Sequence, residues 1–154
     1  MAGERAREQL GTIPGVTLVE GSAPAAARIA AQVPRDQWEA AARLAKDRRC
    51  CHFFSFLTAI DWQADGLEIV AWVDNLAEGF SLQLRTRLAP DAPVCQSLTS
   101  VYRGADWMER ECFDMFGVRF VGHPGLRRIL LADDWEGHPL LKSYAVDTPH
   151  PPYR

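Results

Sequence analysis

Residues 52–88, HFFSFLTAIDWQADGLEIVAWVDNLAEGFSLQLRTRL, contain three consecutive strand patterns. The first, residues 52–60, is rich in aromatic residues and almost continuously apolar, which is typical of a strand covered on both faces. The second, residues 67–74, follows an Ala-Asp-Gly turn, which is a good hairpin signal. The third, residues 80–88, alternates apolar and polar side chains and leaves one face in water. Together these patterns predict an antiparallel sheet.

Two amphipathic helices accompany these strands. Residues 34–47 start with a proline, which suits the first helical position, and carry apolar residues at three-to-four spacing. Residues 105–116, ADWMERECFDMF, form the second helix, where Asp106 can cap the start and Gly117 can end the last turn in a left-handed conformation. The order of elements predicts an α+β fold with one or two helices covering the sheet.

Other segments of the chain have weaker patterns. The first dozen residues are polar, which predicts a frayed end. Residues 16–20 and residues 118–121 each predict a short strand. Residues 24–31 form either a helical turn or a loop, and residues 94–102 are either helical or extended. The sequence leaves these two alternatives open.

The last part of the chain, residues 122–154, is rich in glycine and proline yet strongly apolar. A polar linker would not carry such residues. Fully extended, residues 137–154 would reach about 59 Å at 3.3 Å per residue, more than the roughly 38 Å diameter of a compact chain of this length. The sequence therefore predicts an α+β domain over residues 1–121, followed by an extended arm over residues 122–154 that docks on a partner.

Composition excludes several classes of function. The net charge of −3, from 17 Lys and Arg against 20 Asp and Glu, argues against nucleic-acid binding through bulk positive charge. No stretch approaches the roughly 20 apolar residues of a membrane span. The four cysteines have no C-x-x-C spacing, which predicts buried, reduced thiols and no metal bound by this chain.

Few residues suggest catalysis. Glu109, Glu111 and Asp114 form the densest carboxylate group, but their spacing and the intervening Arg110 favour a solvated or ion-paired helix face. Two alternatives are weaker: a small enzyme that uses Glu109 and Glu111 with His123, and a metal module that uses His123, His138 and Cys112. Each Gly-His-Pro triplet is more typical of a turn.

Arg127 and Arg128 are the strongest candidates for a contact with another protein. Guanidinium groups bind carboxylates in a bidentate manner, and the neighbouring leucines would supply the dry part of an interface. Because the pair begins the arm, we expect that changing both arginines to glutamate leaves the domain folded and weakens assembly. Truncation after Trp135 has the same expected effect.

A family resemblance rests on three motifs: ERECFDMFG at 109–117, GHPGLRRIL at 122–130 and WEGHPL at 135–140, the last followed by Lys142 and Tyr144. In order and spacing these motifs strongly resemble the signature of the C subunit of NADH-quinone oxidoreductase, the 30 kDa subunit of respiratory complex I. The close match covers about residues 104–144. Leu141 departs from the pattern, because a basic residue is frequent at that position.

The resemblance implies a non-catalytic structural subunit in the peripheral arm of a proton-translocating NADH:quinone oxidoreductase, at the cytoplasmic side of the inner membrane. The expected partners are chiefly the D subunit, which forms part of the quinone site, and the nearby iron–sulfur subunits. The chain itself would bind no cofactor, whereas the parent complex implies FMN, iron–sulfur clusters, NADH and quinone. The equivalent subunit of a membrane-bound hydrogenase or formate hydrogenlyase is the alternative.

Two sets of residues follow from these arguments as candidate sites. The partner interface is predicted at Arg127, Arg128, Leu130, Trp135, His138, Leu140 and Tyr144. The signature helix is predicted to contribute Glu109, Arg110, Glu111, Asp114, Met115, Phe116 and Gly117.

Overall fold

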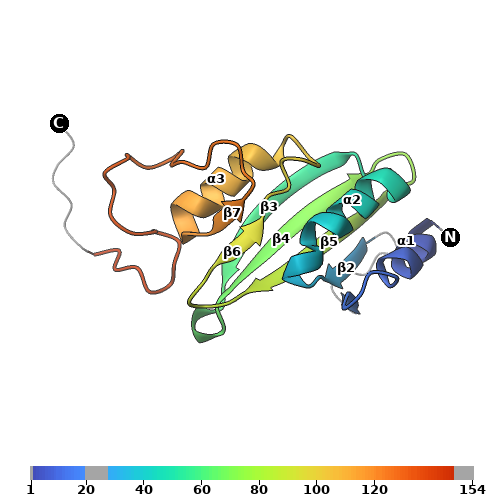
Figure 1. Ribbon diagram of the computed structural model, residues 1–154, viewed down its shortest axis with the longest axis horizontal. Coiled ribbons are helices and arrows are strands. Elements are labelled where there is room, and N and C mark those ends of the chain that lie inside the picture. The colour runs from blue at the N-terminus through green and yellow to red at the C-terminus, as the bar shows by residue number, and fades with distance from the viewer. Residues whose placement is uncertain (1, 20–27, 148–154) are drawn as a thin grey trace.

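A computed structural model of the chain describes residues 2–19 and 28–147. Within these residues the chain forms three helices, seven strands and two short 3₁₀ turns (Figure 1). In chain order they are α1 (Ala2–Leu10), β1 (Thr17–Val19), β2 (Arg28–Gln32), η1 (Arg35–Gln37), α2 (Trp38–Arg49), β3 (Phe53–Asp61), η2 (Gln63–Asp65), β4 (Leu67–Asn75), β5 (Phe80–Leu88), β6 (Val94–Gln96), α3 (Ala105–Phe116) and β7 (Arg119–Val121).

The main sheet has five strands in the order β1-β2-β5-β4-β3. All pairs are antiparallel except β2 with β5. A second, two-stranded sheet pairs β6 with β7 in parallel. This mainly antiparallel α+β architecture confirms the predicted fold class, and the three strands predicted between residues 52 and 88 are β3, β4 and β5.

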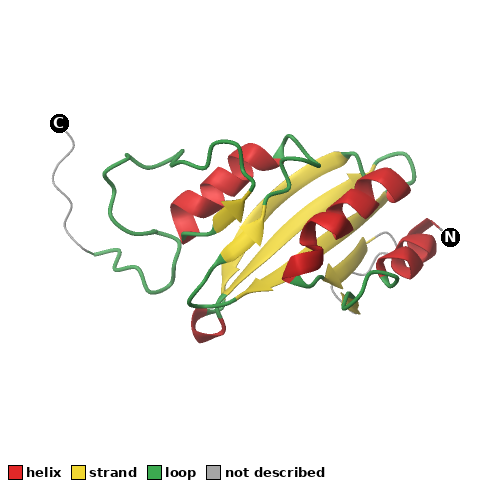
Figure 2. Cartoon of the chain, in the orientation of Figure 1, coloured by secondary structure: helices red, strands yellow, loops and turns green. Residues whose placement is uncertain are grey.

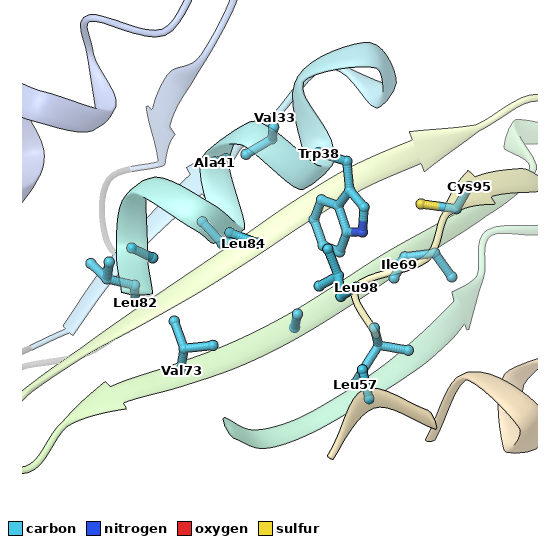
Figure 3. Close-up of a cluster of buried hydrophobic side chains, with 14 of the residues drawn as sticks. Val33, Trp38, Ala41, Leu57, Ile69, Val73, Leu82, Leu84, Cys95 and Leu98 are labelled. Carbon is cyan, nitrogen blue, oxygen red and sulfur yellow. The ribbon is translucent and has the colours of Figure 1, made fainter. Parts of the chain in front are cut away.

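The helices lie on one face of the main sheet (Figure 2). The core fills the space between them and the strands, with Trp38 of α2 at its centre (Figure 3). Ile69 on β4 and Leu82 and Leu84 on β5 point into this core and are fully buried. Leu98, from the turn after β6, packs against the same cluster and joins the small sheet to the main one. Burial of such side chains is worth about 1.5–3 kcal/mol each.

Both predicted helices are present, but α2 does not begin at residue 34: a 3₁₀ turn occupies Arg35–Gln37, and the α-helix runs from Trp38 to Arg49. In α2 the buried residues are Trp38, Ala41, Ala42 and Ala45, which matches the predicted apolar face. Helix α3 spans the predicted residues, and Gly117 ends it with φ +76°, a left-handed conformation that glycine adopts without strain. Asp106 does not cap its start: Gly104 occupies the cap position, and no side chain accepts a hydrogen bond there.

Two expectations about the N-terminal part were wrong. Within the dozen residues expected to be frayed, Ala2–Leu10 form helix α1, whose Ala6 and Leu10, four residues apart, are fully buried. Residues 28–31, part of the segment expected to be a helical turn or loop, belong to β2, because they pair with β1 and β5 on either side. The rest of that segment up to residue 27 lies outside the described residues.

Strand β3 also differs from the expectation. It is an edge strand of the sheet and not a strand covered on both faces. Phe53 is 52% exposed and Phe56 is 39% exposed, because no helix of the described residues covers that side of the sheet. Between residues 94 and 102, the chain forms β6 and then turns.

None of the helices in the described part of the chain is long and apolar enough to cross a membrane.

Candidate functional site

The C-terminal end of helix α3 holds a fully buried carboxylate, that of Asp114. A negative charge is unfavourable there, because the helix dipole places partial negative charge at the same end. The chain compensates with donors from the segment after β7. Oδ2 of Asp114 accepts hydrogen bonds from the backbone nitrogens of Ile129, Leu130 and Leu131 at 3.0, 2.8 and 3.0 Å. Oδ1 lies 2.5 Å from the guanidinium of Arg128.

These contacts determine the ionisation of Asp114. Burial alone would raise the pKa of this carboxyl group. The hydrogen bonds from the Leu131 backbone, from Arg128 and from the backbones of Leu130 and Ile129 outweigh burial and lower the pKa to about 2. Asp114 is therefore an anion near neutral pH and organises residues 128–131.

Arg128 also connects the C-terminal end of α3 to residues 135–137. Its Nη2 donates to the carbonyl oxygens of Trp135 at 2.8 Å and Gly137 at 3.3 Å. One guanidinium group thus joins the end of α3 to two positions farther along. Arg110 on the exposed side of α3 adds a second link, since it donates to the carbonyl oxygens of Arg127 and Arg128 at 3.3 and 3.0 Å.

Three further contacts hold residues 138–142 against the rest of the domain. Nδ1 of His138 lies 2.9 Å from the carbonyl oxygen of Asp114. The backbone nitrogen of Leu140 donates to the carbonyl of Met115 at 3.1 Å, and that of Lys142 donates to the carboxylate of Asp61 at 2.7 Å. Residues 126–142, hereafter the anchored segment, have no helix or strand but are held on the end of α3.

Gly117 is required in this arrangement for a second reason. The ring of His138 packs so closely on Gly117 that a Cβ atom there would lie 2.9 Å from Cδ2 and Nε2 of the imidazole. Only glycine therefore permits both the left-handed helix end and the seat of His138.

Glu109 is a second fully buried carboxylate on α3, and it faces the other way. It accepts hydrogen bonds from the Ser97 hydroxyl at 2.7 Å and the Leu98 backbone at 2.6 Å. Burial raises its pKa to about 7, although both hydrogen bonds act in the opposite direction. Glu109 thereby joins α3 to the turn after β6.

Of the expected solvated or ion-paired carboxylate face on α3, Asp114 is ion-paired but buried, and Glu109 is buried without an ion pair, so the expectation was wrong for Glu109. Only Glu111 of the three is exposed. The sequence lacked a local signal for this burial, because the donors to Asp114 come from residues 14–17 positions later.

The structure divides the predicted partner interface into three groups. The side chains of Arg128 and His138 make contacts within the chain. Trp135 and Tyr144 are half-buried, and the Tyr144 ring packs on Gly137. Arg127 is exposed, as are Leu130 at 62% and Leu140 at 51%. Of the signature helix, Met115 and Phe116 lie in the core.

The alternative sites do not assemble. His123 contacts Asp106, with Nε2 3.1 Å from its carbonyl oxygen, and accepts from the Gly125 nitrogen at 3.0 Å, so it serves a turn. Glu109 is engaged with Ser97 instead. Among the described residues, no three His, Cys, Asp or Glu side chains form a group that could hold a metal ion.

All four cysteines are free thiols. Cys51, Cys95 and Cys112 are buried, and burial raises the pKa of each. Cys50 is exposed, which corrects the expectation that every thiol is buried. It ends helix α2 with a positive φ of 52°.

Comparison with known proteins agrees with the motifs around α3. A family model described as the 30 kDa subunit of respiratory-chain NADH dehydrogenase matches residues 31–150. The chain belongs to this family. The match includes α2, strands β3 to β7, α3 and the anchored segment.

Curated members of the family are similar to the chain over much of its length. The NADH-quinone oxidoreductase C subunit of Moorella thermoacetica is 38% identical over 117 residues, which cover 75% of this chain and 79% of that protein. The C subunit of Trichlorobacter lovleyi is 43% identical over 64% of this chain and 63% of its own length. For the C subunit of Salinispora tropica the identity is 44% over 62% of this chain and 39% of that protein. The chain thus spans less than two thirds of the latter two relatives.

Two solved structures share the fold. A trypsin-resistant fragment of Nqo5 matches with a TM-score of 0.71 at 20% identity, covering 82% of this chain and all of that fragment. A chain from a membrane-bound sulfane sulfur reductase, described as an archaeal respiratory membrane complex, matches with a TM-score of 0.79 at 25% identity. That match covers 95% of this chain and 87% of the other.

Proposed function

We propose that this chain is a non-catalytic structural subunit in the peripheral arm of a proton-translocating NADH:quinone oxidoreductase. The observation that carries the proposal is the anchored segment, whose backbone is held on α3 while Leu130 and Leu140 remain exposed. Two exposed leucines on a segment held in this way fit a docking surface. The contacts within the chain already order the segment's backbone, so binding a partner would cost little further conformational entropy.

The proposed mechanism is positional. Residues 122–154 act as the partner-docking arm, and Asp114 and Arg128 set the direction in which the arm leaves the domain. The contacts with the D subunit and the nearby iron–sulfur subunits would come from Arg127, Leu130, Trp135, Leu140 and Tyr144. Such contacts would hold the electron-transfer path in fixed relation to the quinone site, as supporting residues hold a functional site.

The parent complex would carry FMN and iron–sulfur clusters and would use NADH and quinone, whereas this chain would bind none of them. In this proposal the chain is peripheral, at the cytoplasmic side of the inner membrane. A second candidate is the equivalent subunit of another membrane-bound redox complex, such as a hydrogenase or formate hydrogenlyase. The likeness to a chain of the sulfane sulfur reductase favours keeping this candidate.

Affinity purification of the tagged chain from native membranes tests the proposal. We expect the D subunit and the iron–sulfur subunits to co-purify, together with NADH:quinone reductase activity that the chain alone lacks. Hydrogenase-type subunits in their place would support the second candidate. Recovery of the chain without any redox subunit, in a preparation where another subunit of the complex recovers its own partners, would contradict both.

A further inference from the structure

The face of the main sheet opposite the helices carries a row of aromatic side chains. Phe56 and Trp72 lie opposite each other on β3 and β4 and stack with ring centroids 5.8 Å apart. Phe53 is also exposed on this face, next to Asp74 in the register. Trp62, just after β3, is 43% exposed. We call this surface the helix-free face.

On the helix-free face, the two carboxylates of the described residues are already hydrogen-bonded. Asp74 accepts hydrogen bonds from the indole of Trp72 at 3.2 Å and from the hydroxyls of Ser55 and Ser81. Glu68 accepts from the indole of Trp62 at 3.1 Å and pairs with Arg87 at 3.4 Å. These acidic groups therefore have little capacity left for other cations.

Two guanidinium groups on the same face have no carboxylate partner among the described residues. Arg28 lies over the Trp72 ring, 5.4 Å from its centroid, and reaches it across β5. Among the described residues, the Arg85 guanidinium bonds only to the amide oxygen of Gln83, at 2.8 and 3.0 Å. The chain as a whole has a net charge of −3, so this pair is a local positive feature beside exposed aromatic rings.

We propose that the helix-free face binds an acidic segment of a partner polypeptide. Its carboxylates would pair with Arg28 and Arg85, and an apolar side chain would pack on Phe56 and Trp72. Tryptophan and arginine are enriched among the residues that carry binding energy at protein interfaces. The inference rests on the proposed function, since it assumes an assembly, but it concerns the side of the sheet opposite α3.

Other occupants fit this face less well. A nucleic acid or an anionic membrane needs clusters of roughly four to eight basic residues, and among the described residues of this face only two guanidinium groups lack a carboxylate partner. A second copy related by a two-fold axis would present the same positive face to itself. An acidic polypeptide has the complementary charge without that repulsion.

Photo-crosslinking in the assembled complex tests this inference. A benzophenone amino acid replaces Phe56, and the matched control carries it at Leu76, which is 73% exposed in the turn after β4. We expect the Phe56 probe to label a carboxylate-rich peptide of one other subunit. The double change Arg28→Glu and Arg85→Glu should lower that yield by about tenfold, whereas Arg48→Glu at the end of α2 leaves it unchanged.

The inference would be overturned if the probe labels lipid, nucleic acid, a second copy of this chain or a peptide without carboxylates. A yield no higher than that of the Leu76 control would also overturn it.

Hydroxyl-radical footprinting of the unaltered chain covers the case in which the probe blocks assembly. Phe56 and Trp62 should then be oxidised more slowly in the complex than in the free chain, and equal rates would also overturn the inference. If the chain co-purifies with redox subunits but either result is negative, only this inference fails. If it does not co-purify, the proposed function fails.

Discussion

Arg128 and Asp114 form an ion pair of 2.5 Å between the loop after β7 and the buried end of α3. The carboxylate is fully buried, and the arginine side chain is 16% exposed. A buried pair of this kind is costly to break from one side, because the remaining charge loses its partner. The pair therefore separates Arg128, which the fold needs, from its exposed neighbour Arg127.

The first prediction concerns this difference. Arg128→Glu places two carboxylates together at a buried site, and we expect it to lower the free energy of unfolding by more than about 3 kcal/mol. Arg127→Glu should change it by no more than about 0.5 kcal/mol, because the side chain is exposed. Urea unfolding followed by circular dichroism measures both. Equal stability of the two variants would restore the sequence-based expectation that neither arginine matters for folding.

A second prediction concerns acid. The folded-state pKa of Asp114, about 2, is below its ordinary value of 3.8, so its ionisation stabilises the folded chain above about pH 4 and ceases to do so as the pH falls toward 2. Asp114→Asn should be less stable than the unaltered chain at pH 5, and the difference should shrink by about 1 kcal/mol at pH 3. Glu111→Gln is the control on the same helix. A difference independent of pH would show that the charge of Asp114 is not what matters.

For Glu109, we expect the contribution to stability to change with pH in the opposite direction. Its folded-state pKa, about 7, is above the ordinary 4.5, so the folded chain holds a proton that the unfolded chain has lost. This contribution is complete below about pH 4.5 and is lost as the pH rises through 7. Relative to Glu109→Gln, the unaltered chain should lose roughly 2 kcal/mol between pH 5 and pH 8. Parallel stability curves for the two chains would contradict a raised pKa at this position.

Gly117 allows the backbone and packing effects to be separated. Gly117→Ala incurs both a positive φ and a contact of 2.9 Å with His138, whereas Gly122→Ala has a positive φ with open space around it. We expect about 1 kcal/mol of destabilisation for Gly122→Ala and clearly more for Gly117→Ala.

The second change His138→Ala completes this test. If the close contact is responsible, His138→Ala should recover part of the stability lost in Gly117→Ala. A double-mutant cycle measures this recovery. Additive effects of the two changes would mean that the imidazole and Gly117 do not interact energetically.

The exposed leucines of the anchored segment test the docking role. Leu130→Asp and Leu140→Asp together should leave the unfolding transition within about 0.5 kcal/mol of the unaltered chain, because both side chains face solvent. Recovery of the complex on a tagged chain should fall several-fold. Leu76→Asp, at a more exposed leucine in the turn after β4, is the matched control and should not change recovery. Normal recovery of the double variant would count against these two contacts.

Truncation after Trp135 now has a different expected outcome from the one the sequence suggests. It removes His138 and the backbone donors of Leu140 and Lys142, all of which contact the domain. The loss should therefore affect folding as well as assembly.

Local sequence determined most of the regular structure. Helices α2 and α3 follow from apolar periodicity, and Gly117 marks the end of α3. The hairpin of β3 and β4 follows from the Ala-Asp-Gly turn between them, and β5 follows from its alternation of apolar and polar residues. Each of these signals acts over a few neighbouring residues, so they can be recognised without the rest of the fold. The motifs between residues 109 and 140 likewise identified the family.

Tertiary structure alone decided which polar residues are buried and which face of the sheet stays open. Strand β2 exists because β1 and β5 pair with it, although its own residues have no clear strand pattern. Asp114 is ionised in the interior because four donors arrive from beyond β7, and Glu109 is buried because the turn after β6 covers it. Such partners are distant in sequence, and the energy of a buried charge depends on where its partners lie in space.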